Sequence, residues 1–452
     1  MNKKQLFLVF NVLLVLLLVI LLIGGCSSST TSTATATKAA PTTTTSKTAA
    51  STTAASKTTA SAAAATTAAA TKTLEIGAVA MLTGAASQGG LSSKQGWQLI
   101  IDKYNAAGGL KVGNDTYKLT LDVEDDAMST DQAATSMTKL LQQNNDKIVL
   151  SSLIDSLKVV EYPLTSKAGA LLVATDGVSV SAAFPYADNA DVNSSKPLFI
   201  RTQHAYTDII PGLLDYLKAN YPNVKTIAIN GVTESTTPVI ASAAVNEMTK
   251  RGFTQVGDVE QWAPDISDYT PVMTRILANK PDAIFVVLGG PVALGGEVKV
   301  ARELGFTGPI FTTIKCDVQL QANMAGTNTS DIFVASITLS DPALPQAIQD
   351  VKTLYLQKYP ADQFISDVVG AYNGLWVLLQ TIEKSGSLDP QTIQTTYEGM
   401  TADGSLQTVY GSAKVGGLKT LGVNRAIVEP VAISAVKDGK AVAATWVTYE
   451  LP

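Results

Sequence analysis

The sequence predicts an α/β protein made of two doubly wound lobes, each built on a mainly parallel sheet. Short apolar runs that suit buried strands alternate with longer segments of helical apolar spacing. Small polar loops rich in Gly, Ser and Thr follow several of these runs. The chain beyond residue 73 is longer than one hydrophobic core usually supports, so we expect two domains.

The composition excludes several classes of function. The 452 residues carry a net charge of −5, which gives no electrostatic reason to bind nucleic acid. One histidine is too few for a multi-histidine metal site, and the common hydrolase, metalloprotease and P-loop motifs are missing from the sequence. We therefore predict a binding protein that is not an enzyme and needs no cofactor or metal. His204 is expected at the surface or in a hinge, and the Asn/Asp-rich segment 188–193 in a plain turn.

The N-terminus has the features of an export signal. Two lysines precede an almost unbroken apolar run over 6–23, and small residues then lead to Cys26. The run Ile23-Gly24-Gly25-Cys26 resembles the bacterial lipoprotein box, which implies cleavage after residue 25 and a lipid on the Cys26 thiol. The alternative is an uncleaved membrane anchor, since the run is just long enough to span a bilayer. Either outcome places the rest of the chain outside the cell.

A tether is expected to follow the lipidated cysteine, over 26–73. Its Ser, Thr and Ala residues cannot bury enough apolar surface to offset the entropy of ordering, so we predict disorder. A flexible chain of this length spans roughly 35–40 Å.

The first predicted unit of the globular part is a strand, loop, helix and strand. The expected strands are 74–82 and 117–123, with a helix over 95–105 between them. Such a unit forms a crossover between parallel strands. Ligands collect at the carboxyl ends of such strands, where the loop 83–90 with its candidate contact residue Ser87 falls.

The same alternation continues to the end of the chain. Further strands are expected over 147–150, 170–174, 199–202, 226–230, 256–262, 283–288, 309–313 and 332–336, and hairpin strands over 425–449. Further helices are expected over 130–142, 157–168, 239–250, 269–278, 292–304, 346–359 and 367–385.

Three motifs near the start of this region occur in a fixed order. They are Ile76-Gly77 followed by Leu82-Thr83-Gly84, then Asn105-Ala106-Ala107-Gly108-Gly109, then Glu124-Asp125-Asp126 followed by Ser129 and Asp131-Gln132-Ala133. Together they resemble the branched-chain amino-acid-binding branch of the solute-binding proteins, the capture subunits of ATP-driven importers. The resemblance implies a type I periplasmic-binding fold with a three-strand hinge. The implied limits are 74–200 with 340–420 for lobe 1, and 201–339 with 421–452 for lobe 2.

The resemblance also implies where the first lobe holds a ligand carboxylate. In the family, a hydroxyl and backbone amides after the third strand, and the loop after the fourth, perform this role. Counted without gaps, these positions fall on Asp155 and Ser156, and on Ala174 and Thr175. Ser156 also suits the N-cap of the next helix, and Ser152 replaces it if the register differs.

The second lobe offers Thr233 and the loop around Cys316 as candidate contacts. Amino-acid binders of the family place a carboxylate for the ligand's α-amino group in this loop. Asp317 supplies it if slightly displaced, whereas an inward Lys315 favours an acid without an amine. A third alternative has a solvated Lys315 and an Asp317 that caps a helix.

We therefore expect an extracellular solute-binding lipoprotein of an ABC importer. It would capture a small amino acid, or a related carboxylate or amide, by hinge closure. The expected partners are the permease and ATPase subunits and, through the lipid, the outer face of the cell membrane; the protein itself is expected to be a monomer. A ligand-sensing receptor without a transport role is the alternative.

Overall fold

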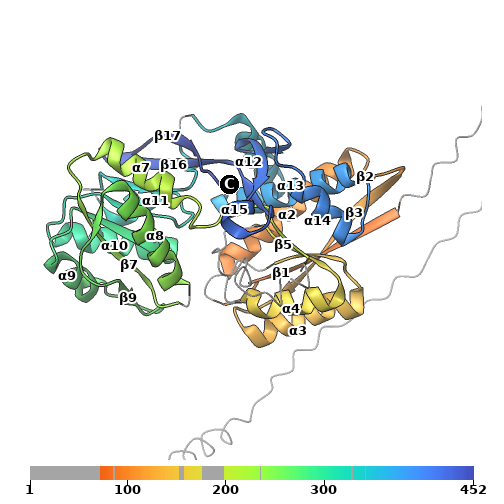
Figure 1. The fold of residues 1–452 in the computed structure, drawn as a ribbon, viewed down its shortest axis with the longest axis horizontal. Helices are drawn as coiled ribbons and strands as arrows, with labels where there is room; N and C mark the ends of the chain where they lie inside the picture. The colour runs from red at the N-terminus through yellow and green to blue at the C-terminus, as the bar shows by residue number, and fades with distance from the viewer. Residues whose placement is uncertain are drawn as a thin grey trace, which may run out of the picture. The chain divides into compact units, whose positions relative to one another are not determined.

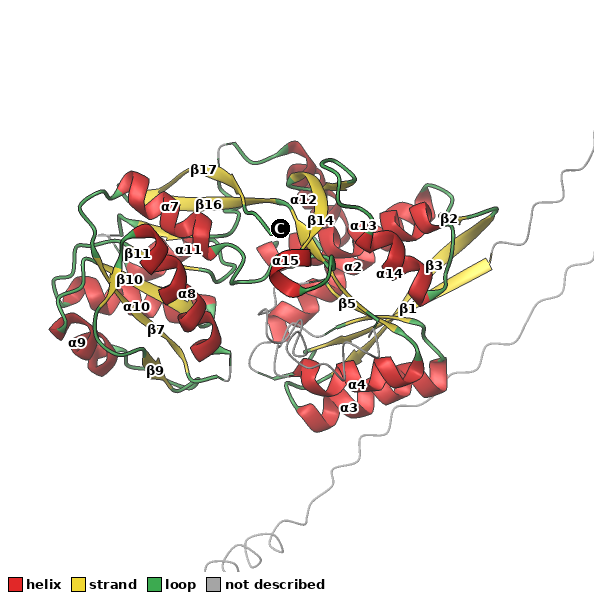
Figure 2. Ribbon diagram, viewed as in Figure 1, coloured by secondary structure: helices red, strands yellow, loops and turns green. Residues whose placement is uncertain are grey.

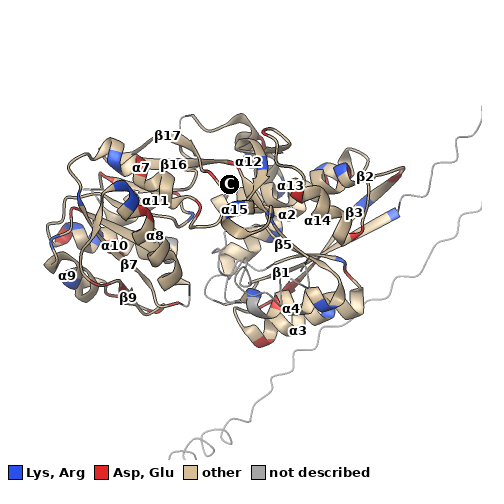
Figure 3. Ribbon diagram, viewed as in Figure 1, with Lys and Arg blue, Asp and Glu red and all other residues tan. Residues whose placement is uncertain are grey.

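Two mainly parallel sheets, each with helices on both faces, form the described part of the chain (Figure 1). This computed structural model describes residues 72–84, 87–151, 157–175, 198–234, 236–326, 329–341 and 343–451. Both sheets belong to the compact unit Ala68–Pro452. Lysine, arginine and acidic residues are interspersed over the helices of both sheets (Figure 3). Within the described ranges, no helix is both long and apolar enough to cross a bilayer.

The first sheet has nine strands in the order β13-β14-β15-β6-β5-β4-β1-β3-β2. The strands from β6 to β3 are parallel neighbours, which confirms the predicted crossover unit. Their bounds are Lys72–Ala80 (β1), Leu110–Val112 (β2), Asp115–Asp125 (β3), Ile148–Leu150 (β4), Leu171–Ala174 (β5), Phe199–Arg201 (β6), Leu406–Thr408 (β13), Gly411–Gly416 (β14) and Ala426–Val428 (β15).

Both faces of the first sheet are buried, which explains the nearly continuous apolar runs of its strands. Ile76, Ala78 and Ala80 pack toward α2 and α13, whereas Val79 packs toward α3 and α4 on the other face (Figure 2). The helices of this sheet are Ser87–Ala106 (α2), Thr130–Lys139 (α3), Lys158–Ala168 (α4), Gln346–Lys358 (α12), Ser366–Ser385 (α13) and Pro390–Glu398 (α14), with a π-helical turn, η1, over Leu140–Asn144.

The second sheet has eight strands. Seven follow the order β17-β16-β12-β11-β10-β7-β8, and β9 also pairs with β7. Phe285, Phe311 and Phe333 occupy matching positions on three neighbouring strands and stack at ring-centroid distances of 4.4 and 4.8 Å. The bounds are Thr226–Val232 (β7), Thr254–Gln255 (β8), Glu260–Trp262 (β9), Ala283–Leu288 (β10), Ile310–Thr312 (β11), Ile332–Val334 (β12), Pro430–Lys437 (β16) and Lys440–Thr448 (β17).

Helices cover both faces of the second sheet as well. Side chains of α7 and α8 pack on the face that carries the phenylalanine stack, and those of α9, α10 and α11 pack on the opposite face. The bounds are Ile210–Asn220 (α7), Thr237–Arg251 (α8), Thr270–Ala278 (α9), Pro291–Glu303 (α10) and Val318–Ala325 (α11), and a short helix, α15, spans Leu418–Leu421.

The chain crosses between the sheets three times. It leaves the first sheet after β6, returns after β12, and leaves again through Glu429, the one residue between β15 and β16. The third crossing lies beyond the expected limit of 420, because β15 pairs with β14 and β6 of the first sheet. Side chains of Ala426 and Val428 nevertheless pack into the core under the second sheet, so the two lobes share this strand.

Several boundaries differ from prediction for physical reasons. β1 begins at Lys72, not 74, because Lys72 and Thr73 pair with β3 and the Lys72 ammonium binds Asp115; the predicted tether limit at 73 is therefore wrong. α2 begins at Ser87, so the second half of the predicted loop 83–90 is helical. Gly90 permits this, since a Cβ there would lie 2.2 Å from the carbonyl oxygen of Met81.

Other elements escaped the sequence reasoning altogether. These are α7, α14, α15 and the strands β2, β8, β13 and β14. Of the predicted strand 256–262 only Glu260–Trp262 is a strand, β9, and Gly257 before it has a φ of +69°. The predictions for Cys26, the signal peptide, most of the tether, Asp155, Ser156 and 188–193 lie outside the described residues.

Candidate functional site

The carboxyl edges of the two sheets carry the candidate residues that the structure describes. Ser87 begins α2 after β1, and Ala174 and Thr175 lie at the end of β5, with only β4 between these strands. Thr233 and Lys315 follow β7 and β11, which flank β10 in the second sheet. Parallel strands place such positions together at one edge.

Thr175 is tightly held within the first lobe. It is fully buried, and its hydroxyl accepts a hydrogen bond from Nε1 of Trp97 at 3.1 Å. Gly374 of α13 leaves room for it, because a Cβ there would lie 2.6 Å from the Thr175 carbonyl oxygen. The carbonyl of Ala174 accepts bonds from the backbone and hydroxyl of Thr202. Thr175 thus fixes Trp97 in the core.

Asp317 and Lys315 share a loop but have different surroundings. The Asp317 carboxylate caps α11 by accepting from the backbone of Gln319 and Leu320, and it also accepts from the backbone of Leu339 at 2.9 Å. Burial raises the pKa of the intervening Cys316 thiol well above its usual value. Lys315 donates from Nζ to Oε1 of Gln203, 2.9 Å away in the first crossing.

Lys315 also lines a pocket at the crossings. Residues from all three crossings and from the first lobe contribute to its wall: His204, Ala335, Ser336, Ile337, Ser366, Tyr410, Pro430, Val431 and Ala432. A half-buried ammonium in this wall can bind an anion, and the cavity itself, about 20 Å³, has room for about one water molecule. Thr233, in contrast, is exposed, and its backbone N–H is bonded to the Trp262 carbonyl.

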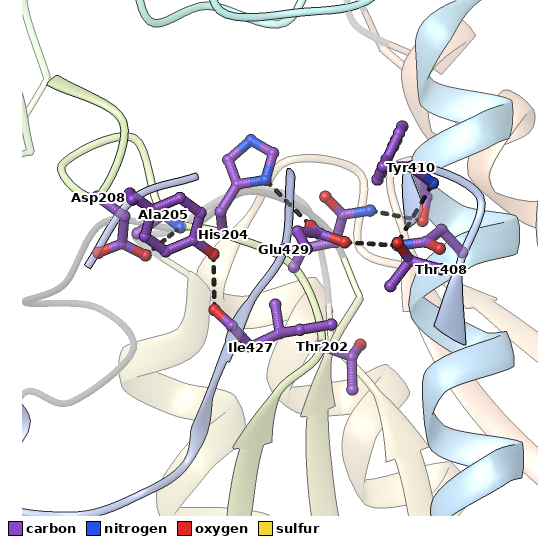
Figure 4. A network of polar contacts seen from close by, with 12 residues as sticks. Thr202, His204, Ala205, Asp208, Thr408, Tyr410, Ile427 and Glu429 are labelled. Carbon is purple, nitrogen blue, oxygen red and sulfur yellow. Dashed lines mark hydrogen bonds and ion pairs between the residues drawn. The ribbon is translucent and has the colours of Figure 1, made fainter. Parts of the chain in front are cut away.

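A polar network that includes the pocket residues His204 and Tyr410 lies at the crossings (Figure 4). His204 Nδ1 lies 3.1 Å from a carboxylate oxygen of Glu429, and both side chains are buried. The other Glu429 oxygen accepts from Asn373 of α13, whose own oxygen accepts from the backbone of Val409. His204 therefore lies at the hinge, one of its two predicted places, and ties the first crossing to the third.

A buried ion pair also holds the first crossing in place. Arg201 and Asp208 meet at 2.6 Å with both side chains almost wholly buried, and the Asp208 carboxylate also accepts from the backbone of Ala205. The Tyr449 hydroxyl donates to the carbonyl of Ile427 (Figure 4). Burial raises the pKa of this tyrosine well above its usual value, so it remains a donor.

Sequence reasoning missed Gln203, Tyr410 and Glu429 as residues of this region. Gln203 and Glu429 each follow a strand at a crossing, which was a usable signal once the crossings were placed. Tyr410 lies in the turn between β13 and β14, a hairpin that local patterns did not reveal.

Comparison with known proteins agrees with this architecture. A family model described as periplasmic binding protein matches residues 73–440. The branched-chain amino acid transporter substrate binding protein LivJ of Streptococcus pneumoniae, in complex with isoleucine, has a TM-score of 0.64 at 19% identity; the match covers 83% of this chain and 100% of that one. The leucine binding protein LivK of Thermotoga maritima has a TM-score of 0.65 at 14% identity, covering 83% and 99%.

A third solved structure is similar to the same extent. It is a solute binding protein of an ABC transporter from Rhodopseudomonas palustris, in complex with 3,4-dihydroxy benzoic acid, with a TM-score of 0.64 at 18% identity and coverage of 84% and 99%. At such identities the three structures share the fold. Since the family match spans most of the sequence and both sheets, this chain belongs to the periplasmic binding protein family and has its type I fold.

Proposed function

We propose that this protein is the solute-binding lipoprotein of an ABC importer and that it captures a small organic acid at the hinge. The observation that carries the proposal is the position of Lys315 in the wall of the hinge pocket, beside His204. An ammonium there attracts a carboxylate and forms a charge-assisted hydrogen bond with it.

The surroundings of Asp317 favour an acid without an α-amino group. Both oxygens of its carboxylate already accept hydrogen bonds from the backbone that follows and from the segment at Leu339. Turning this carboxylate to a ligand ammonium would uncap α11. The complex of the Rhodopseudomonas protein with a benzoic acid illustrates such a ligand on this fold, and the isoleucine complex illustrates the alternative.

Closure of the two lobes would complete the site. We propose Ser87, Asp155, Ser156, Ala174 and Thr175 on the first lobe as contacts for one end of the ligand. Thr233 and Lys315 would then meet the other end, so that a bound ligand stabilises the closed state by bridging both lobes. In this proposal the first lobe begins at Lys72, the third crossing lies at Glu429, and the other expected lobe limits are kept, with β15 shared between the lobes.

Two substitutions separate the ligand classes. Lys315→Met should weaken binding of an amine-free acid by roughly ten- to a hundred-fold, the effect of losing one charge-assisted hydrogen bond. Asp317→Asn should weaken binding of an amino acid by a similar factor if that carboxylate contacts it. Calorimetry of the purified chain against amino acids, short amides and aromatic and aliphatic acids measures both effects. Lys299→Met, which removes an exposed lysine of α10, is the matched control.

Two results would contradict the pocket assignment. One is a ligand whose affinity is the same for the wild type, Lys315→Met and Lys299→Met. The other is unchanged affinity in Thr175→Ala and Ser156→Ala together, which would exclude the first-lobe contacts.

Membrane attachment through Cys26 is a separate part of the proposal, supported by the apolar run and the small residues before it. Cys26→Ser should abolish lipid attachment and release the protein or leave it unprocessed. Metabolic labelling with a fatty acid tests this, and undiminished labelling of the variant would refute it. Permease and ATPase genes beside this one would favour import, whereas a neighbouring signalling protein would favour the sensor alternative.

A further inference from the structure

Three carboxylates from different parts of the first sheet meet on the face covered by α3. Glu75 belongs to β1, Asp122 to β3, and Asp146 precedes β4. β1 pairs with both β3 and β4, and this pairing brings together acids far apart in the sequence. One oxygen from each carboxylate lies within 4.8 Å of an oxygen from each of the others.

The buried carboxylate of Asp146 is directed at this cluster. Asp146 is only 4% exposed, and its Oδ2 has no hydrogen-bond partner among the described residues. Gly77 leaves the hollow in which it lies, since a Cβ there would be 2.7 Å from Oδ2. Burial, followed by the charges of Glu75 and Asp122, raises the pKa of Asp146 to about 7. A buried oxygen without a donor, facing two further carboxylates, is a position that a cation would stabilise.

The neighbouring polar groups are already arranged around the cluster. The π-helical turn η1 ends at Asn145, whose φ is 61°, and the Asp146 backbone N–H donates to the carbonyl of Leu140 at 3.0 Å. Asn144 donates from its side chain to Asp122. The nearby Lys139 binds Glu124, the next acid on this face of β3, at 2.5 Å.

We infer that Glu75, Asp122 and Asp146 form a binding site for one divalent cation, with Ca²⁺ as the preferred ion. Hard cations prefer carboxylate oxygens, and the three oxygens lie within 4.8 Å of one another. Ca²⁺ accepts oxygen ligands in flexible geometry, whereas Mg²⁺ requires a nearly ideal octahedron and retains several waters, so three carboxylates from separate segments favour Ca²⁺. The site lies away from the carboxyl edge that holds the candidate ligand residues, so calcium and ligand binding are separable.

The test is calcium binding by the purified full chain, measured by calorimetry and by thermal unfolding in calcium or in a chelator. An affinity in the range of extracellular calcium modules, about 10⁻⁴–10⁻³ M, is expected. In about 10 mM calcium the unfolding temperature should then rise by roughly 2–5 °C, with a smaller rise in magnesium at equal ionic strength. Glu75→Gln, which changes an exposed residue, and Asp146→Asn should each weaken binding at least about tenfold.

Without calcium, Glu75→Gln should raise the thermal stability of the protein. In the chelator, Glu75→Gln should unfold at a higher temperature than the wild type, because it removes a like charge. Asp403→Asn, an exposed acid of the first lobe, is the charge-matched control and should keep the full calcium response. Absence of a calcium-specific response in the wild type, or an equal response in Glu75→Gln and Asp403→Asn, would overturn the site.

Discussion

Glu297 of α10 is a carboxyl group enclosed in the core beneath the second sheet. It is 1% exposed, and Asn230 of β7 and the Trp262 indole, both buried, face it. Burial raises the pKa of Glu297 to about 8, and Asn230 and Trp262 oppose this rise. Burial of the Tyr269 hydroxyl, followed by the charge of Glu297, raises the pKa of Tyr269 to about 12. The carboxyl is therefore mostly neutral in the folded protein at pH 7.

This residue should make the protein less stable as the pH rises. Between 4.5, the ordinary pKa of glutamate, and about 8, the folded state binds a proton that the unfolded state has lost. The stabilisation is complete below the lower value and is lost through this window, by roughly 1 kcal/mol per pH unit. Urea denaturation from about pH 5 to 8 measures the slope. Glu297→Gln should flatten it, while Glu303→Gln, an exposed acid of the same helix, should not.

The elements that join the lobes are tied to one another rather than free. His204 in the first crossing binds Glu429 in the third, and Ser434 of β16 donates to the carbonyl of Ser336 in the second at 2.7 Å. Glu429 is the one residue between β15 and β16. Its carboxylate contacts His204 and Asn373, so it connects the third crossing to the first crossing and to α13. These bonds tie the three crossings to one another.

Removing the charge of Glu429 should weaken this hinge. In Glu429→Met, a side chain of similar length without an acceptor, Asn373 and the His204 ring both lose the carboxylate that they contact. A buried polar group that loses its partner costs about 1–3 kcal/mol in unfolding free energy. Denaturation by urea, with Glu450→Met as the exposed control, measures the loss. An unfolding free energy equal to that of the control would show that the network is not needed.

On the scale of the whole molecule, the first described strand, β1, begins at Lys72. Lys72 and Thr73 extend β1 against Tyr117 and Lys118, and the Lys72 ammonium binds Asp115 at 2.5 Å. The Ser/Thr/Ala-rich sequence before this point lacks a pattern that forms a core.

Two deletions should therefore differ in effect. Removal of residues 27–71 should leave the unfolding temperature unchanged within error, since no strand residue is lost. Removal of 27–73 should lower it measurably, because two pairs of the β1–β3 ladder and an ion pair disappear. Thermal unfolding of both chains against the full chain provides the comparison. Lower stability in the shorter deletion would show that the tether docks on the folded part.

The sequence by itself determined the α/β class, the strand and helix order of most of the chain and the family. The class and the order of elements depend on local periodicity, because a strand buried on both faces needs a continuous apolar run wherever it occurs. The strand predicted over 283–288 coincides with β10 for this reason. The family was indicated by the three motifs that occur in a fixed order between Ile76 and Ala133.

Only the tertiary structure decided how the polar side chains are used. Asp317 is held by Leu339 and Glu429 by His204, and such partners are distant in sequence and leave no periodic trace. The cluster of Glu75, Asp122 and Asp146 likewise exists only because β1 pairs with β3 and β4. Apolar burial repeats along each element and can be recognised locally. A hydrogen bond or a cation site instead depends on residues that are distant in sequence and come into contact only in the folded chain.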